Sequence, residues 1–146
     1  MLKKILLVED NPNDVELTLE ALAEHKIANS TEVARDGEEA IDYLYQQGRF
    51  KDRPAGNPAV ILLDLKLPKI SGLEVLNTIK SDDELKVIPV VILTSSREEQ
   101  DLVKSYNLGV NAYVVKPIEF NEFIQAVGAL GLFWAIINEA PPGSLQ

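Results

Sequence analysis

The sequence predicts an α/β protein built on a parallel sheet, and two observations lead to this fold class. Short apolar runs of strand length alternate five times with segments whose apolar residues recur at helical spacing. The most apolar of these runs show no alternation with polar residues, which is typical of strands buried on both faces. Strands that alternate with helices imply parallel pairing through right-handed crossovers.

The first strand and helix are predicted at the N-terminus. The run Lys3–Val8 is apolar enough for a buried strand. Asn11 is suited to cap the helix that follows and Pro12 to begin it, and Asp14 complements the helix dipole. Apolar residues at helical spacing carry this helix to about His25.

A second strand and helix are followed by a long loop. The stretch Ser30–Arg35 is β-branched and partly alternating, which favours a strand. A helix is expected over Glu38–Gln47. Its predicted apolar stripe is Ala40, Ile41, Leu44 and Tyr45. The stretch Gly48–Pro58 contains two glycines and two prolines, and we expect it to be a loop.

The central strand is predicted at Ala59–Leu63, which is wholly apolar and leads directly into Asp64. A third helix opens at Gly72 and ends near Ser81. Its apolar positions are Leu73, Leu76 and Ile79. The polar stretch Asp82–Lys86 is expected to link this helix to the next strand.

Two further strand–helix pairs complete the predicted fold. Strands are expected at Ile88–Leu93 and Asn111–Val115, and a weakly amphipathic helix at Arg97–Tyr106 lies between them. The last helix runs from Glu119. Its apolar stripe is Phe120, Phe123, Ile124, Val127, Leu130, Trp134 and Ile137.

Composition narrows the range of functions. The 146 residues suit one domain, and the absence of cysteine excludes disulfides and thiolate chemistry. The net charge of −9 offers no electrostatic footprint for nucleic acid, and no apolar stretch reaches the length of a membrane span. We therefore expect a cytoplasmic protein that binds neither nucleic acid nor membranes.

The predicted strands end on residues that can do chemistry. In a parallel sheet all carboxyl ends meet at one edge, which is where ligands bind in open α/β sheets. The residues that follow the strands there are Glu9, Asp10, Asp64, Thr94 and Lys116. A single acid in such a place is often only a capping residue, but four strand ends that all carry reactive groups favour a site.

The cluster is suited to a phosphoryl group. Neighbouring carboxylates repel one another unless a cation joins them, and oxygen ligands without His or Cys favour Mg²⁺. A metal ion and Lys116 would neutralise phosphoryl oxygens, and the Thr94 hydroxyl would donate one hydrogen bond. Asp64 is the candidate nucleophile, since aspartyl phosphates are an established covalent intermediate. The chain lacks the glycine-rich fingerprints of dinucleotide and P-loop sites.

Four motifs in this order resemble the receiver domain of two-component response regulators. They are VEDN at Val8–Asn11, LLDLKLPKISG at Leu62–Gly72, LTSS at Leu93–Ser96 and YVVKP at Tyr113–Pro117. The resemblance implies a doubly wound, five-stranded parallel sheet in the order 2-1-3-4-5 with five helices, the CheY-like fold. We expect this domain to span residues 1–138, with a flexible tail at 139–146.

The resemblance also implies roles for the site residues. Asp64 would accept a phosphoryl group from a phosphohistidine on a sensor kinase. Mg²⁺ would bind Asp10, Asp64 and the backbone carbonyl of Lys66, and it would reach Glu9 mostly through water. Lys116 would contact a phosphoryl oxygen.

Further family features concern the switch and the tuning of the site. Thr94 and Tyr113 would form the switch pair, and a cis bond before Pro117 would turn the preceding lysine toward the site. Lys66 and Ser96 occupy positions that tune dephosphorylation in this family. Lys66 could shield the acyl phosphate or hinder an attacking water.

A narrower resemblance links the chain to the small response regulators that partner bacterial phytochromes in cyanobacteria and related organisms. It rests on the loop Gly48–Pro58, on Leu67–Leu76, on Ile79–Ser96 and on the ending at Phe133 and Trp134. It implies a phytochrome-type sensor kinase as partner. We expect output through protein contacts, because the chain leaves no room for a DNA-binding effector.

The last helix carries a candidate interface. Its apolar stripe continues beyond what one sheet needs, through Phe133, Trp134 and Ile137. Such patches mark partner sites as well as intramolecular packing. Because receivers commonly dimerise through the fourth helix, fifth strand and fifth helix, we expect a homodimer through that face.

Two other functions compete with the phosphorylated switch. A Mg²⁺-dependent phosphohydrolase of the aspartyl-phosphate type usually carries a second Asp two residues after the nucleophile, but Lys66 stands there. A receiver fold used as a phosphorylation-independent binding module would not need the site residues that are present. We therefore expect a switch that catalyses only its own phosphotransfer and dephosphorylation.

Overall fold

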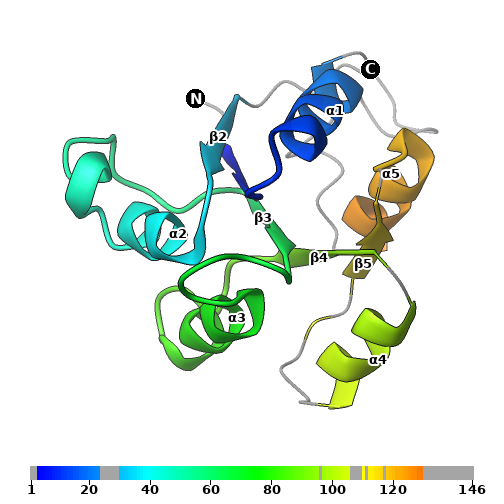
Figure 1. Cartoon of the computed structure of the whole chain (residues 1–146). Coiled ribbons are helices and arrows are strands. Elements are labelled where there is room, and N and C mark those ends of the chain that lie inside the picture. The colour runs from blue at the N-terminus through cyan, green and yellow to red at the C-terminus, as the bar shows by residue number, and fades with distance from the viewer. Residues whose placement is uncertain are drawn as a thin grey trace, which may run out of the picture.

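The computed structural model describes residues 3–23, 30–95, 97–105, 110, 112–116 and 118–129 of the chain. Its strands are β1 (Ile5–Val8), β2 (Thr31–Ala34), β3 (Val60–Asp64), β4 (Val90–Thr94) and β5 (Ala112–Val115). Its helices are α1 (Pro12–Ala23), α2 (Gly37–Leu44), α3 (Gly72–Ser81), α4 (Arg97–Ser105) and α5 (Phe120–Ala129), with a short 3₁₀ turn, η1 (Gly48–Phe50). The strands form one parallel sheet in the order β2-β1-β3-β4-β5, which confirms the predicted fold class (Figure 1).

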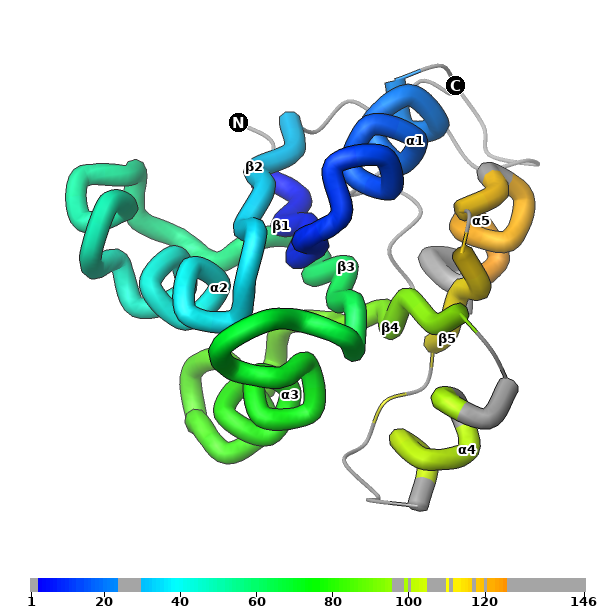
Figure 2. The backbone as a smooth tube through the Cα atoms, in the orientation of Figure 1, coloured from blue at the N-terminus to red at the C-terminus, as the bar shows by residue number. Residues whose placement is uncertain are grey.

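The helices cover both faces of the sheet. Helices α1 and α5 lie on one side, and α2, α3 and α4 lie on the other (Figures 1 and 2). Successive strand residues therefore enter different cores: Leu6 and Val8 pack toward α2 and α3, whereas Ile5 and Leu7 pack toward α1. Strands β1, β3 and β4 are buried along their whole length, as their unbroken apolar sequences predict.

Side-chain caps begin the helices where the sequence predicts them. The Asn11 Oδ1 atom accepts the backbone N–H groups of Asn13 at 2.9 Å and Asp14 at 3.1 Å. The Ser71 hydroxyl accepts the N–H of Glu74 at 3.2 Å and so caps α3. Both caps satisfy N–H groups that a helix leaves without partners, and both lie next to the ends of β1 and β3.

Gly72 lets α3 start close to the end of β3. A Cβ atom added to Gly72 would overlap the backbone carbonyl oxygen of Asp64 and lie 2.5 Å from the Cα atom of Leu65. The Gly72 N–H also donates to the Leu65 carbonyl at 3.0 Å. Only glycine allows this approach, which fixes the backbone from which the Asp64 side chain projects.

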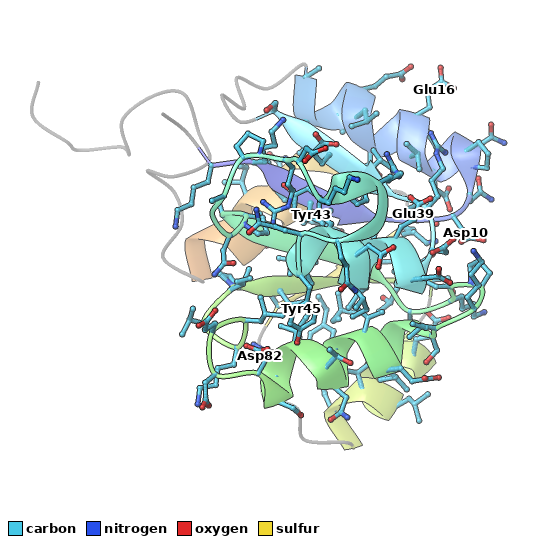
Figure 3. The ribbon with its side chains drawn as sticks, turned by 90° about the vertical axis from the view of Figure 1, so that its left-hand side faces the viewer. Asp10, Glu16, Glu39, Tyr43, Tyr45 and Asp82 are labelled. Atoms are coloured by element: carbon cyan, nitrogen blue, oxygen red, sulfur yellow. The ribbon has the colours of Figure 1, made fainter. Side chains whose placement is uncertain are left out.

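The end of α2 differs from the prediction. The helix ends at Leu44, and the chain turns through Gln46 at a φ of 54°. Tyr43 is therefore the buried tyrosine, whereas Tyr45 is 44% exposed and its hydroxyl donates to the Asp82 Oδ2 atom at 2.7 Å (Figure 3). The predicted burial of Tyr45 is wrong because the helical spacing that supports it does not extend past Leu44.

The predicted loop after α2 contains ordered contacts. It includes η1, whose Phe50 ring meets the Tyr43 ring edge-on with the ring centroids 5.1 Å apart. The Arg53 guanidinium lies 4.1 Å from the Tyr43 ring centroid and donates to the Tyr43 carbonyl at 2.7 Å. These contacts attach the loop to α2, although its composition predicts only an irregular connection.

Several predictions fall outside the described residues. They concern the bond before Pro117, the interface residues Phe133, Trp134 and Ile137, and the tail at 139–146. The end of the domain at residue 138 likewise stays a prediction. Within the described part of the chain, no helix is both long enough and apolar enough to cross a membrane.

Candidate functional site

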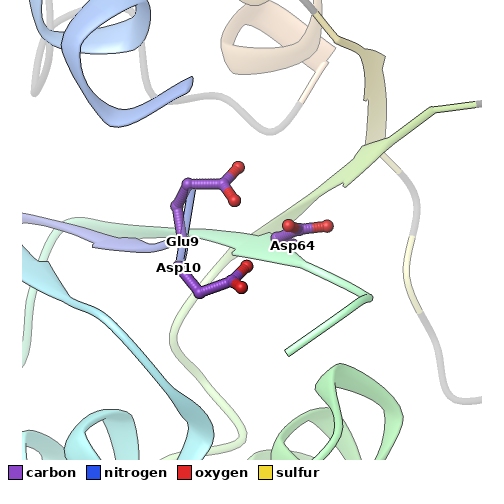
Figure 4. Close-up of side chains that lie close together, drawn as sticks. All are labelled: Glu9, Asp10 and Asp64. Carbon is purple, nitrogen blue, oxygen red and sulfur yellow. The ribbon is translucent and has the colours of Figure 1, made fainter. Parts of the chain in front are cut away.

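Three carboxylates meet at the carboxyl edge of the sheet. Glu9 and Asp10 follow β1, and Asp64 ends β3, the neighbouring strand in the sheet. One carboxylate oxygen from each of the three lies within 4.8 Å of the others (Figure 4). Glu9 and Asp64 are buried and Asp10 is exposed, so the cluster is open to solvent on one side. The predicted convergence of these residues is confirmed.

Lys116 lies beside this cluster and contacts three carboxylates. Its Nζ atom is 3.2 Å from Glu9 Oε1, 3.1 Å from Asp64 Oδ2 and 3.1 Å from Asp14 Oδ2. The backbone N–H of Lys116 donates to the Thr94 carbonyl at 2.7 Å, which continues the pairing of β4 with β5 beyond the last strand residue. This pairing places Lys116 at the edge of the sheet where the carboxylates lie.

The charges in the site perturb one another. Burial raises the pKa of Glu9 to about 7, and the contact with Asp64 and its charge add to the effect, although Lys116 opposes it. Burial alone would lower the pKa of Lys116, but the charge of Asp64 and its hydrogen bond, joined by Asp14 and Glu9, raise it above its usual value. An ammonium among carboxylates therefore stays charged, and the site still favours a further cation.

Thr94 ends β4 next to this cluster and is fully buried. Its Oγ1 atom has no hydrogen-bond partner among the residues that the structure describes. A buried hydroxyl without a partner loses its hydrogen bonds to water and gains none in return. A phosphoryl oxygen at the sheet edge would supply the acceptor that the hydroxyl lacks, which fits the role expected of Thr94.

Lys66 contributes to the site mainly through its backbone. Its N–H donates to Asp64 Oδ1 at 3.2 Å. Its ammonium group instead lies 3.2 Å from Glu99 Oε2 on α4 and is largely exposed. Glu99 also accepts the Ser95 N–H at 2.9 Å and the Ser95 hydroxyl at 3.0 Å. In this conformation the Lys66 side chain ties the β3–α3 loop to α4.

The pKa of Glu99 reflects this set of contacts. Burial alone would raise the pKa of Glu99, but the hydrogen bonds from Ser95 and the nearby charge of Lys66 hold it below its usual value. Glu99 is therefore a stable anion that joins α4 to the residue immediately after Thr94.

Tyr113 lies on β5, on the same side of the sheet as α4. Its ring is partly buried against the core that includes Val103, and burial raises the pKa of its hydroxyl. The hydroxyl donates to the Val110 carbonyl at 3.4 Å, and the Lys104 ammonium lies 5.3 Å from the ring centroid. No described contact joins the Tyr113 ring to the Thr94 side chain, so the predicted switch pair of these two residues stays a prediction.

Asp14 is a site residue that the sequence reasoning missed. It was assigned to the helix dipole, and its backbone N–H does bond to the Asn11 cap. The first turn of α1, however, points its carboxylate at Lys116, 102 residues away in the chain. The available signal is its place in the first turn of the helix that directly follows the acidic pair Glu9 and Asp10.

The donor set fits a divalent cation with a preference for oxygen ligands. Three carboxylates converge without any nitrogen or sulfur donor among them, and one of them has a raised pKa because it is buried beside another. Magnesium and manganese both accept such ligands, and water can complete the coordination on the exposed side.

Comparison with known proteins identifies the family. The sequence model of the response regulator receiver domain matches residues 5–128. The chain belongs to the response regulator receiver family. Receiver domains bind divalent metal ions and act as switches in two-component signalling. The carboxylates and the lysine described above lie at the carboxyl edge of the sheet, where the sequence motifs predict them.

Individual relatives include phytochrome response regulators. Response regulator Rcp1 of Synechocystis is 43% identical over 132 residues, which are 90% of this chain and 88% of that protein, and its Mn²⁺-bound structure superimposes with a TM-score of 0.72. The bacteriophytochrome response regulator AtBRR is 65% identical with a TM-score of 0.91, covering 95% of this receiver and 99% of AtBRR. The phosphorylated cyanobacterial phytochrome response regulator RcpA is 46% identical with a TM-score of 0.73, covering 92% and 94%.

Proposed function

We propose that this receiver is a phosphorylation-controlled switch in which Asp64 accepts a phosphoryl group from a sensor histidine kinase. One observation carries the proposal. The Asp64 carboxylate is held from both sides, by the Lys66 N–H at 3.2 Å and by the Lys116 ammonium at 3.1 Å, next to two further carboxylates. A carboxylate fixed in this way beside a cation site is oriented to attack a phosphorus atom.

The transfer requires few protein groups. One oxygen of Asp64 forms a bond to phosphorus while the phosphorus–nitrogen bond of the phosphohistidine breaks, and the electron pair of that bond returns to the imidazole. Lys116 offsets charge on the phosphoryl oxygens, and a metal ion held by the carboxylates would add to this effect. The buried Thr94 hydroxyl, which has no described partner, is available to donate to one of these oxygens.

The metal ion of this proposal is Mg²⁺. Asp10, Asp64 and the Lys66 carbonyl would bind it directly, and Glu9 would contact it mostly through water. The three converging carboxylates and the Mn²⁺-bound form of Rcp1 support a divalent ion of this kind. Magnesium supplies positive charge to the phosphoryl oxygens without redox chemistry.

The proposed kinase is of the phytochrome type, and output is proposed to pass through protein contacts in the cytoplasm. The relationship to RcpA and AtBRR supports a phytochrome partner. We further propose a homodimer through α4, β5 and α5. On that face Leu102 and Val115 are 48% and 41% exposed, which is apolar surface that a partner could cover.

Phosphate incorporation tests the proposed function. The wild-type protein and Asp64→Asn are incubated with acetyl phosphate, with Mg²⁺ or with EDTA, and separated on a phosphate-affinity gel. The proposal predicts a base-labile, acid-stable adduct that requires both Asp64 and Mg²⁺. An unmodified wild type would reject it in favour of a binding module. Rapid turnover of a small phosphate ester without an adduct would instead support a phosphohydrolase.

A further inference from the structure

The Lys116 ammonium has a third partner that the phosphoryl chemistry does not use. Glu9 and Asp64 belong to the cluster that would hold the metal ion, whereas Asp14 lies outside that cluster, on α1. We propose that Asp14 is a positioning residue that holds Lys116 in place when the metal ion and the phosphoryl group occupy its other two partners. This inference rests on the proposed function of Asp64.

The geometry assigns each ammonium hydrogen to one carboxylate. The three Nζ–oxygen distances of Lys116 are 3.1, 3.1 and 3.2 Å, and its side chain is only 19% exposed. An ammonium group has three hydrogens and accepts no hydrogen bond. Each hydrogen of the Lys116 ammonium therefore has a carboxylate partner, and these carboxylates come from the residue after β1, from α1 and from β3.

Phosphorylation changes two of these three contacts. Once Asp64 is esterified, its oxygens carry less charge, and the ammonium must turn toward a phosphoryl oxygen. Glu9 would share its negative charge with a bound metal ion and so hold Lys116 less strongly. Asp14 is neither the phosphorylated residue nor a member of the metal cluster, so its contact with Lys116 can persist when the other two change.

Asp14 is itself held in place. Its N–H donates to the Asn11 Oδ1 atom at 3.1 Å, within the first turn of α1. The next residue, Val15, is buried in the core between α1 and the sheet. The Asp14 backbone therefore cannot shift unless α1 moves on the sheet, which makes its carboxylate a stable anchor.

A charge without a positioning role would have the opposite effect. Removal of an uninvolved negative charge near the site would strengthen the binding of an anionic phosphoryl analogue, because repulsion falls. Removal of an anchor would weaken the same binding, because Lys116 would no longer be held toward the anion. The sign of the change therefore separates the two roles.

The test measures the affinity for beryllofluoride at saturating Mg²⁺ by titration calorimetry. The variants are Asp14→Asn, Asp14→Glu and, as a control with the same change of charge, Glu16→Gln, an exposed residue on the outer side of α1 (Figure 3). We expect Asp14→Asn to weaken binding about tenfold, Asp14→Glu to restore part of it, and Glu16→Gln to stay within about twofold of wild type. Equal affinities of Asp14→Asn and Glu16→Gln, or tighter binding by Asp14→Asn, would overturn the proposal.

A second measurement does not depend on phosphoryl chemistry. Urea unfolding of Asp14→Asn, Lys116→Met and the double variant forms a cycle that reports the contact itself. We expect the effects of the two substitutions to be non-additive, and additive effects would overturn the contact on which the proposal stands. A wild type that shows this coupling but binds no beryllofluoride would reject the proposed function and, with it, the phosphoryl role of Asp14.

Discussion

Two lysines of this receiver each contact more than one carboxylate, and they differ mainly in burial. Lys116 is 19% exposed, and its three partners are 0%, 4% and 29% exposed. Lys69, in the loop between β3 and α3, is 58% exposed and lies 3.4 Å from Asp36 and 3.8 Å from Glu38. The same residue types thus form a buried cluster at the sheet edge and a solvated cluster on the surface.

Their electrostatics differ for the same reason. The charge of Asp36 raises the pKa of Lys69, but water screens this exposed interaction, so it contributes little to stability. At Lys116 the partners are desolvated, and one of them, Glu9, has a pKa raised to about 7. Water exclusion, and not the number of charged residues, makes one cluster a chemical site and leaves the other as ordinary surface.

The position of the surface cluster is set by backbone packing. A Cβ atom on Gly37 would overlap the Ile70 carbonyl oxygen, so α2 and the β3–α3 loop already meet through their backbones. The ion pair of Lys69 forms across a contact that exists without it. In the Lys116 cluster the contacts are made by side chains, and they connect α1 to the ends of the paired strands β1 and β3.

The largest expected effect is that of Lys116→Met on phosphorylation. The substitution removes the only cation described in contact with Asp64, and we expect phosphorylation by acetyl phosphate to slow about a thousandfold. The rate is read from the time course of the phosphorylated band. A decrease of less than about tenfold would show that the Lys116 ammonium contributes little to the transfer.

The next effect concerns the pH dependence of stability. The folded chain keeps the Glu9 proton up to a pH of about 7, whereas the unfolded chain releases it near 4.5. Without divalent ions, the free energy of unfolding should therefore fall as the pH rises between these values and level off above 7. The substitution Glu9→Gln removes this loss, so at pH 8 the free energy of unfolding of the variant should exceed that of wild type by about 3 kcal/mol.

Denaturant unfolding at several pH values checks this prediction. The gap between Glu9→Gln and wild type should close as the pH falls below about 4.5, because both folded and unfolded chains are then protonated at this position. Glu38→Gln, an exposed acid of the surface cluster, is the matched control and should show no such gap. A gap of the same size at every pH would refute the buried charge as its cause.

The smallest effect is expected for Lys69→Met. Because its ion pairs are exposed, the variant should phosphorylate within about twofold of the wild-type rate and unfold at an unchanged urea concentration. Both measurements run in parallel with those on Lys116→Met. A loss of phosphorylation comparable to that of Lys116→Met would remove the distinction between the two clusters.

The sequence predicts much of this arrangement but not all of it. Local patterns place the apolar strands, the cap at Asn11 and the start of α3 at Gly72, because these depend on neighbouring residues. The convergence of Glu9, Asp64 and Lys116 follows from one topological rule, that parallel strands end at a common edge. The order of the strands does not follow from this rule, and only the resemblance to known receivers predicts it.

The missed features depend on distant contacts. The role of Asp14 requires a helix start to face a lysine 102 residues later, which no local pattern encodes. The side chain of Lys66 pairs with Glu99 on α4, a contact that no local pattern indicates, and its effect on the acyl phosphate stays a prediction. Tyr43 and Tyr45 are two residues apart, and only the end of the helix decides which one is buried.

The most direct test of the central claim identifies the residue that carries the phosphoryl group. The protein is treated with acetyl phosphate and Mg²⁺, reduced with sodium borohydride, which converts an aspartyl phosphate to homoserine, and mapped by peptide mass spectrometry. If Asp64 carries the phosphoryl group, we expect homoserine at position 64, and we expect every other aspartate to stay unchanged. Homoserine at Asp10 or Asp14, or at no position while the adduct is present, would contradict it.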